Sequence, residues 1–326
     1  MRNGLCILAA LLLAVPAAGQ QQVEELRGQE FQPVPTRRTQ EARQPVPELE
    51  AARVLLEADQ PKAAFQTALD WTLANRTHPS RDQGLLLMSR GLYGHGNPVK
   101  AFYYLDELMD TYPASPYFYD ALQLQYDMAE ALLDGYKLRA LGLPLVNATG
   151  VGEEMMQRVQ QRSPGSPLAE RALLRTADFY MREGQYDIAS DAYRSYLESY
   201  PRSRRVPEVR VRRILANVAL YAGPPYDPTP LLDARAQARE LLADDPALAN
   251  AERMPELLTW IDEQMGAKLL NTAEYYERVN KPAAARKVLR DILRVLPETP
   301  AAETARRRLG EADTETTAPE TPPEAE

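Results

Sequence analysis

The sequence predicts an all-α fold, a right-handed superhelical solenoid of about six consecutive helix pairs. Three observations predict it: one complete helix–turn–helix repeat near the middle of the chain, further copies of its apolar pattern, and a proline at a similar place after each copy. Self-similarity at intervals of about 20–50 residues is the sequence signature of stacked structural repeats.

The complete repeat runs from Ala169 to Ser203. Gly184 lies where the turn between its two helices is expected, because glycine tolerates a positive φ, and Pro201 cannot continue the second helix. Large and small residues alternate at helical spacing in both halves, namely Leu173, Ala177, Tyr180, Ala189, Tyr193, Tyr196 and Leu197. This alternation lets two helices interdigitate and is typical of a tetratricopeptide repeat.

Further copies appear when the small residue Ala189 is taken as the origin. Apolar residues lie 4, 7, 8 and 11 positions after this origin, and a proline lies 12 positions after it. The same pattern recurs, wholly or in part, from five other origins. The six origins are Ala64, Ala101, Gly152, Ala189, Ala234 and Ala285, at intervals of 37, 51, 37, 45 and 51 residues. A minimal repeat needs about 34 residues, so the excess is expected in loops or lengthened helices.

The helix pairs can be placed in order along the chain. Two pairs are expected over residues 48–80 and 83–115, and a third begins with a tyrosine-rich helix over 117–136. An apolar insertion, Lys137–Gly150, follows; it is expected either to pack back on the solenoid or to contact a partner. Residues 223–230 should form a rigid proline-rich loop within the fifth pair, and residues 253–279 a long first helix in the sixth.

The two ends of the chain differ from the repeats. Residues 1–19 are predicted to be a secretory signal peptide, because Arg2 precedes an apolar run that ends in small residues at Gly19. If uncut, this segment would serve as an N-terminal anchor. Residues 20–47 are proline-rich and predict a disordered linker, while the acidic residues 311–326 predict a disordered tail. The solenoid is therefore expected over residues 48–310.

Composition argues against several classes of function. The chain has 46 acidic and 38 basic residues, and its net charge of −8 becomes −9 when the positive charge of Arg2 leaves with the signal. An exported acidic protein is a poor candidate for nucleic-acid binding. The single cysteine, Cys6, lies in the signal and the two histidines are isolated beside loops. We therefore expect no metal site, cofactor site, catalytic residues or enzyme activity.

Stacked repeats present a concave surface lined by their first helices, which suits an extended peptide. The repeat positions that should face this groove carry side chains of both charges and an aromatic ring. Such side chains can bind both the backbone and the carboxylate of a peptide. The candidate groove residues are Arg90, Tyr93, Arg171, Asp178, Arg182, Glu274 and Arg278. The alternative is that each is an ordinary exposed helix residue.

One basic cluster follows the central repeat and forms a candidate docking patch of Arg204, Arg205, Arg210 and Arg213. Arg210 and Arg213 are three residues apart in the sequence and should share a helix face. Such a patch would bind carboxylates of a partner protein or lipid head groups. The alternative is a solvated outer face.

Residues 168–305 resemble the BamD family, the periplasmic tetratricopeptide subunit of the machinery that assembles outer-membrane β-barrels. The resemblance lies in residues 184–203 (GQYDIASDAYRSYLESYPRS), 233–246 (DARAQARELLADDP) and 269–305, where AEYYERVNKPAAA precedes a second helix that closes at Leu-Pro. It is good over the C-terminal half and looser over residues 49–163.

The resemblance implies a non-catalytic periplasmic scaffold at the inner leaflet of the outer membrane. Such a protein would contact the barrel-forming insertase and receive the C-terminal segments of unfolded outer-membrane proteins. Members of the family are usually lipoproteins, whereas this signal does not end in a cysteine, so protein contacts or an uncut signal would have to hold the chain at the membrane. The other interpretation is a tetratricopeptide scaffold of a cell-division or peptidoglycan-coordination system.

Overall fold

The computed structural model describes residues 24–27, 30–33, 44–140 and 143–316. The chain divides into two compact units, one formed by Met1–Met128 with Leu138–Val146 and the other by Ala129–Lys137 with Asn147–Glu326. Within each unit, most helices that follow one another in sequence pack against one another. This arrangement confirms the predicted architecture of consecutive helical repeats.

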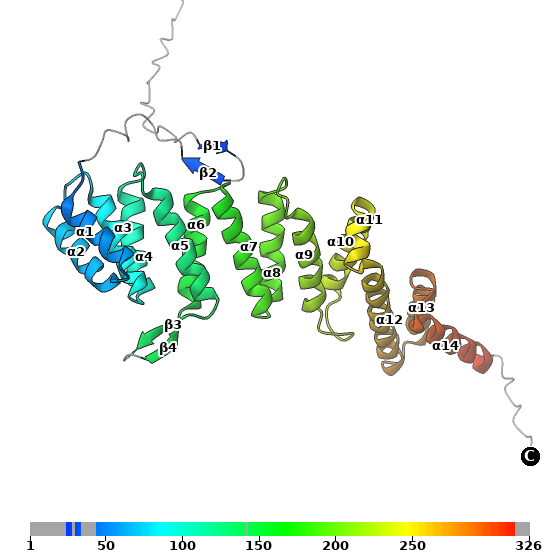
Figure 1. Ribbon diagram of the computed structural model, residues 1–326. Coiled ribbons are helices and arrows are strands. Elements are labelled where there is room, and N and C mark those ends of the chain that lie inside the picture. Colours follow the sequence, from blue (N-terminus) through cyan, green and yellow to red (C-terminus); the bar gives the residue numbers. More distant parts are fainter. Residues whose placement is uncertain (1–23, 28–29, 34–43, 141–142, 317–326) are drawn as a thin grey trace, which may run out of the picture. The chain divides into compact units, whose positions relative to one another are not determined.

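The first unit holds the first two predicted pairs (Figure 1). Its helices are α1 (Pro47–Glu57), α2 (Pro61–Ala74), α3 (Arg81–Gly94), α4 (Pro98–Thr111) and the first part of α5 (Phe118–Leu133). The helix α3 is central, since it packs on α1, α2 and α4. Gly91 allows α2 to come close, because a Cβ at this position would lie only 2.8 Å from the Pro61 carbonyl oxygen and the Phe65 nitrogen.

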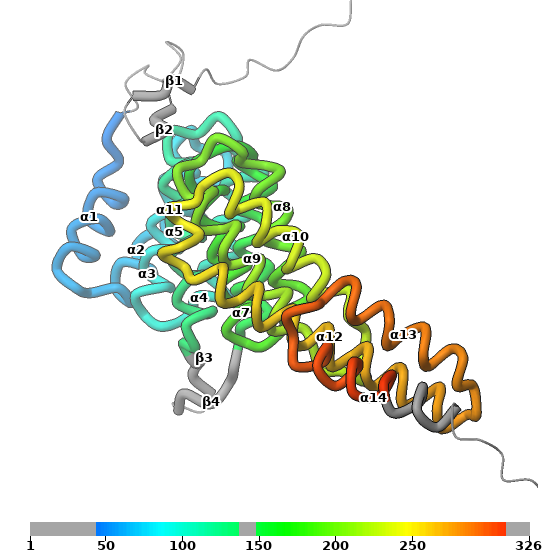
Figure 2. The backbone as a smooth tube through the Cα atoms, turned by 90° about the vertical axis from the view of Figure 1, so that its right-hand side faces the viewer, coloured from blue at the N-terminus to red at the C-terminus, as the bar shows by residue number. Residues whose placement is uncertain are grey.

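The second unit continues the series from the end of α5. Its helices are α6 (Thr149–Arg162), α7 (Pro167–Arg182), α8 (Tyr186–Ser199), α9 (Val206–Leu220), α10 (Thr229–Asp244), α11 (Pro246–Ala251), α12 (Met254–Arg278), α13 (Pro282–Val295) and α14 (Pro300–Thr316). Each helix from α6 to α10 packs on the next, and α12, α13 and α14 pack together (Figure 2). The loop between α9 and α10 and the long α12 agree with the sequence-based expectation.

The alternation of large and small side chains forms the core between α7, α8 and α9. Ala177 and Ala189 are fully buried, and the rings of Tyr193 and Tyr196 are no more than 1% exposed. Small residues let the helix backbones approach, and the tyrosine rings fill the remaining space. The repeating pattern seen in the sequence is therefore a packing pattern.

A hydroxyl residue after the proline stop links one repeat to the next. Ser115 and Ser203 each accept a hydrogen bond from the backbone N–H two residues later, over 3.1 Å. Each also donates to a carboxylate near the start of the preceding repeat's first helix, Ser115 to Asp82 and Ser203 to Glu170. The same side chain thus accepts a hydrogen bond at the start of one helix and donates one to the first helix of the preceding repeat.

The predicted linker, insertion and tail contain regular structure where the chain is described. β1 (Glu24–Arg27) pairs antiparallel with β2 (Glu30–Pro33) inside the predicted linker. β3 (Lys137–Ala140) and β4 (Leu143–Asn147) form a second two-stranded sheet within the insertion. α14 runs to Thr316, into the predicted tail, because the first proline there is Pro319. The predicted signal peptide and residues 317–326 lie outside the described residues.

Candidate protein-binding site

The candidate groove residues all lie on first helices of their pairs. Arg90 and Tyr93 are on α3 in the first unit, whereas Arg171, Asp178 and Arg182 are on α7 and Glu274 and Arg278 on α12 in the second. Arg171, Asp178 and Arg182 are 7 and 4 residues apart and share one face of α7. The structure therefore groups the candidates helix by helix: Arg90 with Tyr93, Arg171 with Asp178 and Arg182, and Glu274 with Arg278.

Asp178 belongs to a polar network that links three helices. It accepts a 2.8 Å hydrogen bond from the Tyr193 hydroxyl on α8 and 2.7 Å hydrogen bonds from Arg212 on α9. Arg212 also pairs with Glu208, one turn away on its own helix. Burial of the Tyr193 ring and its bond to Asp178 raise the pKa of this tyrosine well above its usual value. Asp178 thus stabilises the packing of α7, α8 and α9.

Three other candidates pair with a neighbouring first helix or with the turn that follows one. Arg90 lies 3.2 Å from Asp120 on α5, and Glu274 accepts a 2.9 Å hydrogen bond from Arg308 on α14. Arg182 lies 3.1 Å from Asp134, just after α5. Hydrogen bonds from Arg175 and then from Arg182 lower the pKa of Asp134. Carboxylate–arginine pairs therefore join consecutive repeats along this row of helices.

The remaining candidates are two arginines and one tyrosine. Arg171 is exposed near the start of α7, and Arg278 is exposed in the last turn of α12. Tyr93 is half-buried at the end of α3. Arg171 and Arg278 thus place exposed cations on the first helices α7 and α12.

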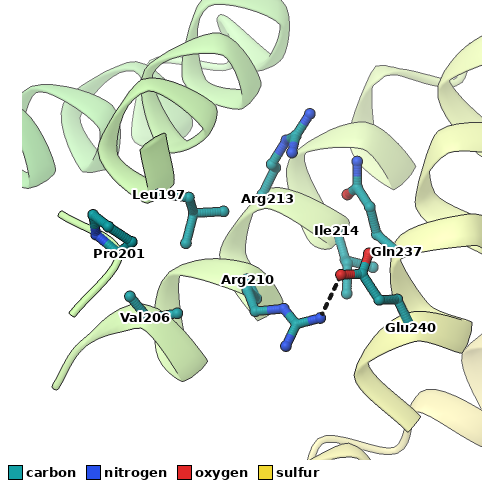
Figure 3. A pocket seen from close by; sticks show the side chains of 8 residues that line it. All are labelled: Leu197, Pro201, Val206, Arg210, Arg213, Ile214, Gln237 and Glu240. Atoms are coloured by element: carbon teal, nitrogen blue, oxygen red, sulfur yellow. Dashed lines mark ion pairs between the residues drawn. The ribbon is translucent and has the colours of Figure 1, made fainter. Parts of the chain in front are cut away.

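The candidate docking patch divides into a surface part and a recessed part. Arg204 and Arg205 are exposed where α9 begins. Arg210 and Arg213 both lie on α9, as their spacing predicted, and line a cavity of about 280 Å³ among α8, α9 and α10 (Figure 3). The other lining residues are Leu197, Pro201, Val206, Ile214, Gln237 and Glu240.

The two arginines in this cavity are in different electrostatic states. Arg210 lies 3.1 Å from Glu240 and 2.8 Å from Asp244, both on α10. Arg213 has no ion-pair or hydrogen-bond partner among the described residues, and its Nε is buried. Burial, and then the nearby cation of Arg194, lower the pKa of Arg213 below its usual value. Arg210 is therefore already neutralised, whereas Arg213 is a half-buried cation that forms no ion pair among the described residues.

A second cavity of about 410 Å³ lies between α6 and α7, and the sequence reasoning missed it. Its wall carries Glu153, Glu154, Gln157 and Gln160, and the Tyr180 hydroxyl donates a 2.7 Å hydrogen bond to Glu153. Burial and this bond raise the pKa of Tyr180 to about 12. The polar stripe at spacings of three and four residues on α6 was the sequence signal that could have indicated it.

Two further searches of the described residues bear on function. No group of three or more His, Cys, Asp or Glu side chains in this part of the chain could hold a metal ion. None of the helices described is both long enough and apolar enough to cross a membrane.

The family comparison covers the unit that contains both cavities. Residues 150–324 match the model of a family described as YfiO, outer membrane lipoprotein. The chain belongs to this family. The match includes the whole stretch that resembled BamD and confirms that resemblance, because YfiO is the BamD-like family. A comparison with curated proteins found no match.

Proposed function

We propose that this member of the YfiO family is a non-catalytic scaffold of the cell envelope that takes part in outer-membrane protein assembly. The observation that carries the proposal is that the family match and the helical repeats cover the same residues, α6 to α14. Stacked repeats offer an extended surface of many side chains, which suits binding of another polypeptide. The partners would be a barrel-forming insertase and segments of unfolded outer-membrane proteins.

The proposal includes export to the periplasm and association with the outer membrane. It is supported by the family description and by the signal-like pattern of residues 1–19. Membrane fractionation together with N-terminal sequencing of the purified protein tests both parts. We expect a mature N-terminus after Gly19 and recovery with outer membranes; recovery in the cytoplasmic fraction would refute this placement.

The partner is tested by crosslinking in intact cells, followed by affinity purification and mass spectrometry. We expect the barrel-forming insertase and unassembled outer-membrane proteins among the crosslinked products. Recovery of cell-division or peptidoglycan-synthesis proteins in their place would support the other scaffold function and refute this one.

The surface is tested by charge reversal at exposed positions. Arg171→Glu and Arg278→Glu should reduce crosslinking of the partner, because both arginines are exposed on first helices. Arg290→Glu is the matched control, since Arg290 is equally exposed but lies on the second helix α13. Equal yields from all three variants would show that the row of first helices is not the contact surface.

A further inference from the structure

We propose that the cavity lined by Arg213 anchors a partner segment that presents an acidic side chain next to an apolar one. The inference rests on the proposed scaffold function and names the chemistry of one of its contacts. It also replaces the predicted patch of four arginines by one arginine, Arg213, in a cavity that has apolar lining residues.

The first observation is a pair of hydrogen-bond donors that have no acceptor. The guanidinium of Arg213 is one of them. The other is the side-chain amide of Gln237: the Ser190 hydroxyl donates to Asn217 over 2.7 Å, and Asn217 donates to the Gln237 oxygen over 3.2 Å. This series of hydrogen bonds uses the side-chain oxygen of Gln237 as an acceptor, and the N–H₂ group of Gln237 has no acceptor among the described residues. Both donors line the same cavity, and a carboxylate is an acceptor that can bind a guanidinium and an amide together.

The second observation is that nearby acids do not neutralise Arg213. Asp191, Glu198 and Asp233 act on it only through long-range attraction, and Asp191 already pairs with Arg194 at 2.8 Å. Glu240, on the cavity rim, is held by Arg210 (Figure 3). A half-buried charge without a partner costs free energy, and an incoming carboxylate would remove that cost.

The third observation is the apolar wall beside these donors. Leu197, Pro201, Val206 and Ile214 supply it, and the cavity of about 280 Å³ is slightly smaller than the range of about 300–1,000 Å³ typical of small-molecule sites. This size suits insertion of side chains from a protein segment. A membrane surface would instead be met by several exposed cations, whereas the cation that lines this cavity without an ion pair, Arg213, is partly buried beside apolar side chains. The geometry therefore favours a protein partner.

The test measures discrimination between a carboxylate and its isosteric amide. The probes are end-blocked fluorescent hexapeptides in which one Glu is flanked by Leu, Val or Phe, each with a twin that carries Gln. Fluorescence polarisation with the full mature protein should show that at least one Glu peptide binds about tenfold more tightly than its twin, as expected for a desolvated charge-assisted contact. Arg213→Gln should abolish this preference.

The matched control is Arg239→Gln, which removes an exposed arginine of α10 that does not line the cavity, and it should leave the preference unchanged. Arg213→Lys keeps the charge and the apolar stem. It should bind the Glu peptide about threefold more weakly than the wild type does, because an ammonium group cannot donate two parallel hydrogen bonds as a planar guanidinium does. The inference is wrong if no Glu peptide is preferred, or if the preference survives Arg213→Gln. It is also wrong if Arg213→Gln weakens binding to phosphatidylglycerol vesicles and leaves peptide binding unchanged. If the protein crosslinks to barrel-assembly proteins but shows no preference for Glu peptides, this inference alone is wrong. If it prefers Glu peptides through Arg213 but does not crosslink to barrel-assembly proteins, only the proposed function is wrong.

Discussion

The network around Asp178 leads to a prediction that separates structural charges from binding charges. Asp178→Ala removes the acceptor for the hydroxyl of Tyr193, whose ring is only 1% exposed, and one of two partners of Arg212. The variant should therefore be destabilised even though Asp178 lies at a predicted groove position.

The magnitude follows from the contacts that are lost. A hydrogen bond to a charged acceptor contributes about 1.5–3 kcal/mol. The Asp178–Arg212 pair is about one third exposed on both sides, so its share is at most about 1 kcal/mol. Arg212 keeps Glu208 as a partner and is not left unpaired. We expect Asp178→Ala to lower the free energy of unfolding by about 2–4 kcal/mol.

Urea denaturation monitored by circular dichroism measures this, and a double-mutant cycle isolates the hydrogen bond. Tyr193→Phe alone should cost about 1.5–3 kcal/mol, and the double-mutant cycle should show a coupling of similar size between the two side chains, because both variants remove the same hydrogen bond. Glu263→Ala, at an exposed position of α12, is the control and should change stability by less than about 0.5 kcal/mol. A coupling near zero would refute the assignment of Asp178 to the packing network. Partner binding lost in a charge-reversed Asp178 variant would then reflect a direct contact.

Three other predictions concern stability. Gly91→Ala should lower the free energy of unfolding by about 1–3 kcal/mol, because its Cβ would overlap the backbone of α2. Gly150→Ala has open space around the new Cβ and should raise the free energy of unfolding by about 0.5 kcal/mol. Urea denaturation of both variants measures the two changes. The pKa of Tyr196 is raised to about 12 by burial and by its bond to Glu170, so its contribution to stability should be complete below pH 10 and decline as pH rises to 12; the unfolding midpoint of Tyr196→Phe should depend less steeply on pH there. Arg213→Met should raise the free energy of unfolding by about 1 kcal/mol in thermal unfolding, because an unpaired, partly desolvated charge is replaced by an apolar side chain.

The regular spacing of small and large residues was sufficient to predict the helix pairs. Ala177 of α7 packs in one core with Ala189 and Tyr193 of α8, because helix periodicity places each residue on the inner face of its own helix, which is a local property of the chain. The sequence also placed Arg210 and Arg213 on one face of α9 for the same reason. It did not predict the hairpins, whose strands are short, nor the six residues by which α14 passes residue 310.

The candidate site depended on contacts that the sequence could not supply. That Asp178 faces a partner stays a prediction, but the sequence could not show that Arg212, 34 residues away, and Tyr193 on the next helix bind its carboxylate. Arg210 and Arg213 have the same residue type and share a helix face, yet only Arg210 meets Glu240 and Asp244 on α10.

The sequence by itself determined the class of fold, the order of the helices and the family, because these follow from periodic patterns within short stretches. Only the tertiary structure decided which charged residues are already satisfied and which remain available. That outcome depends on how neighbouring helices are placed, and a few ångströms separate an ion pair from a free charge.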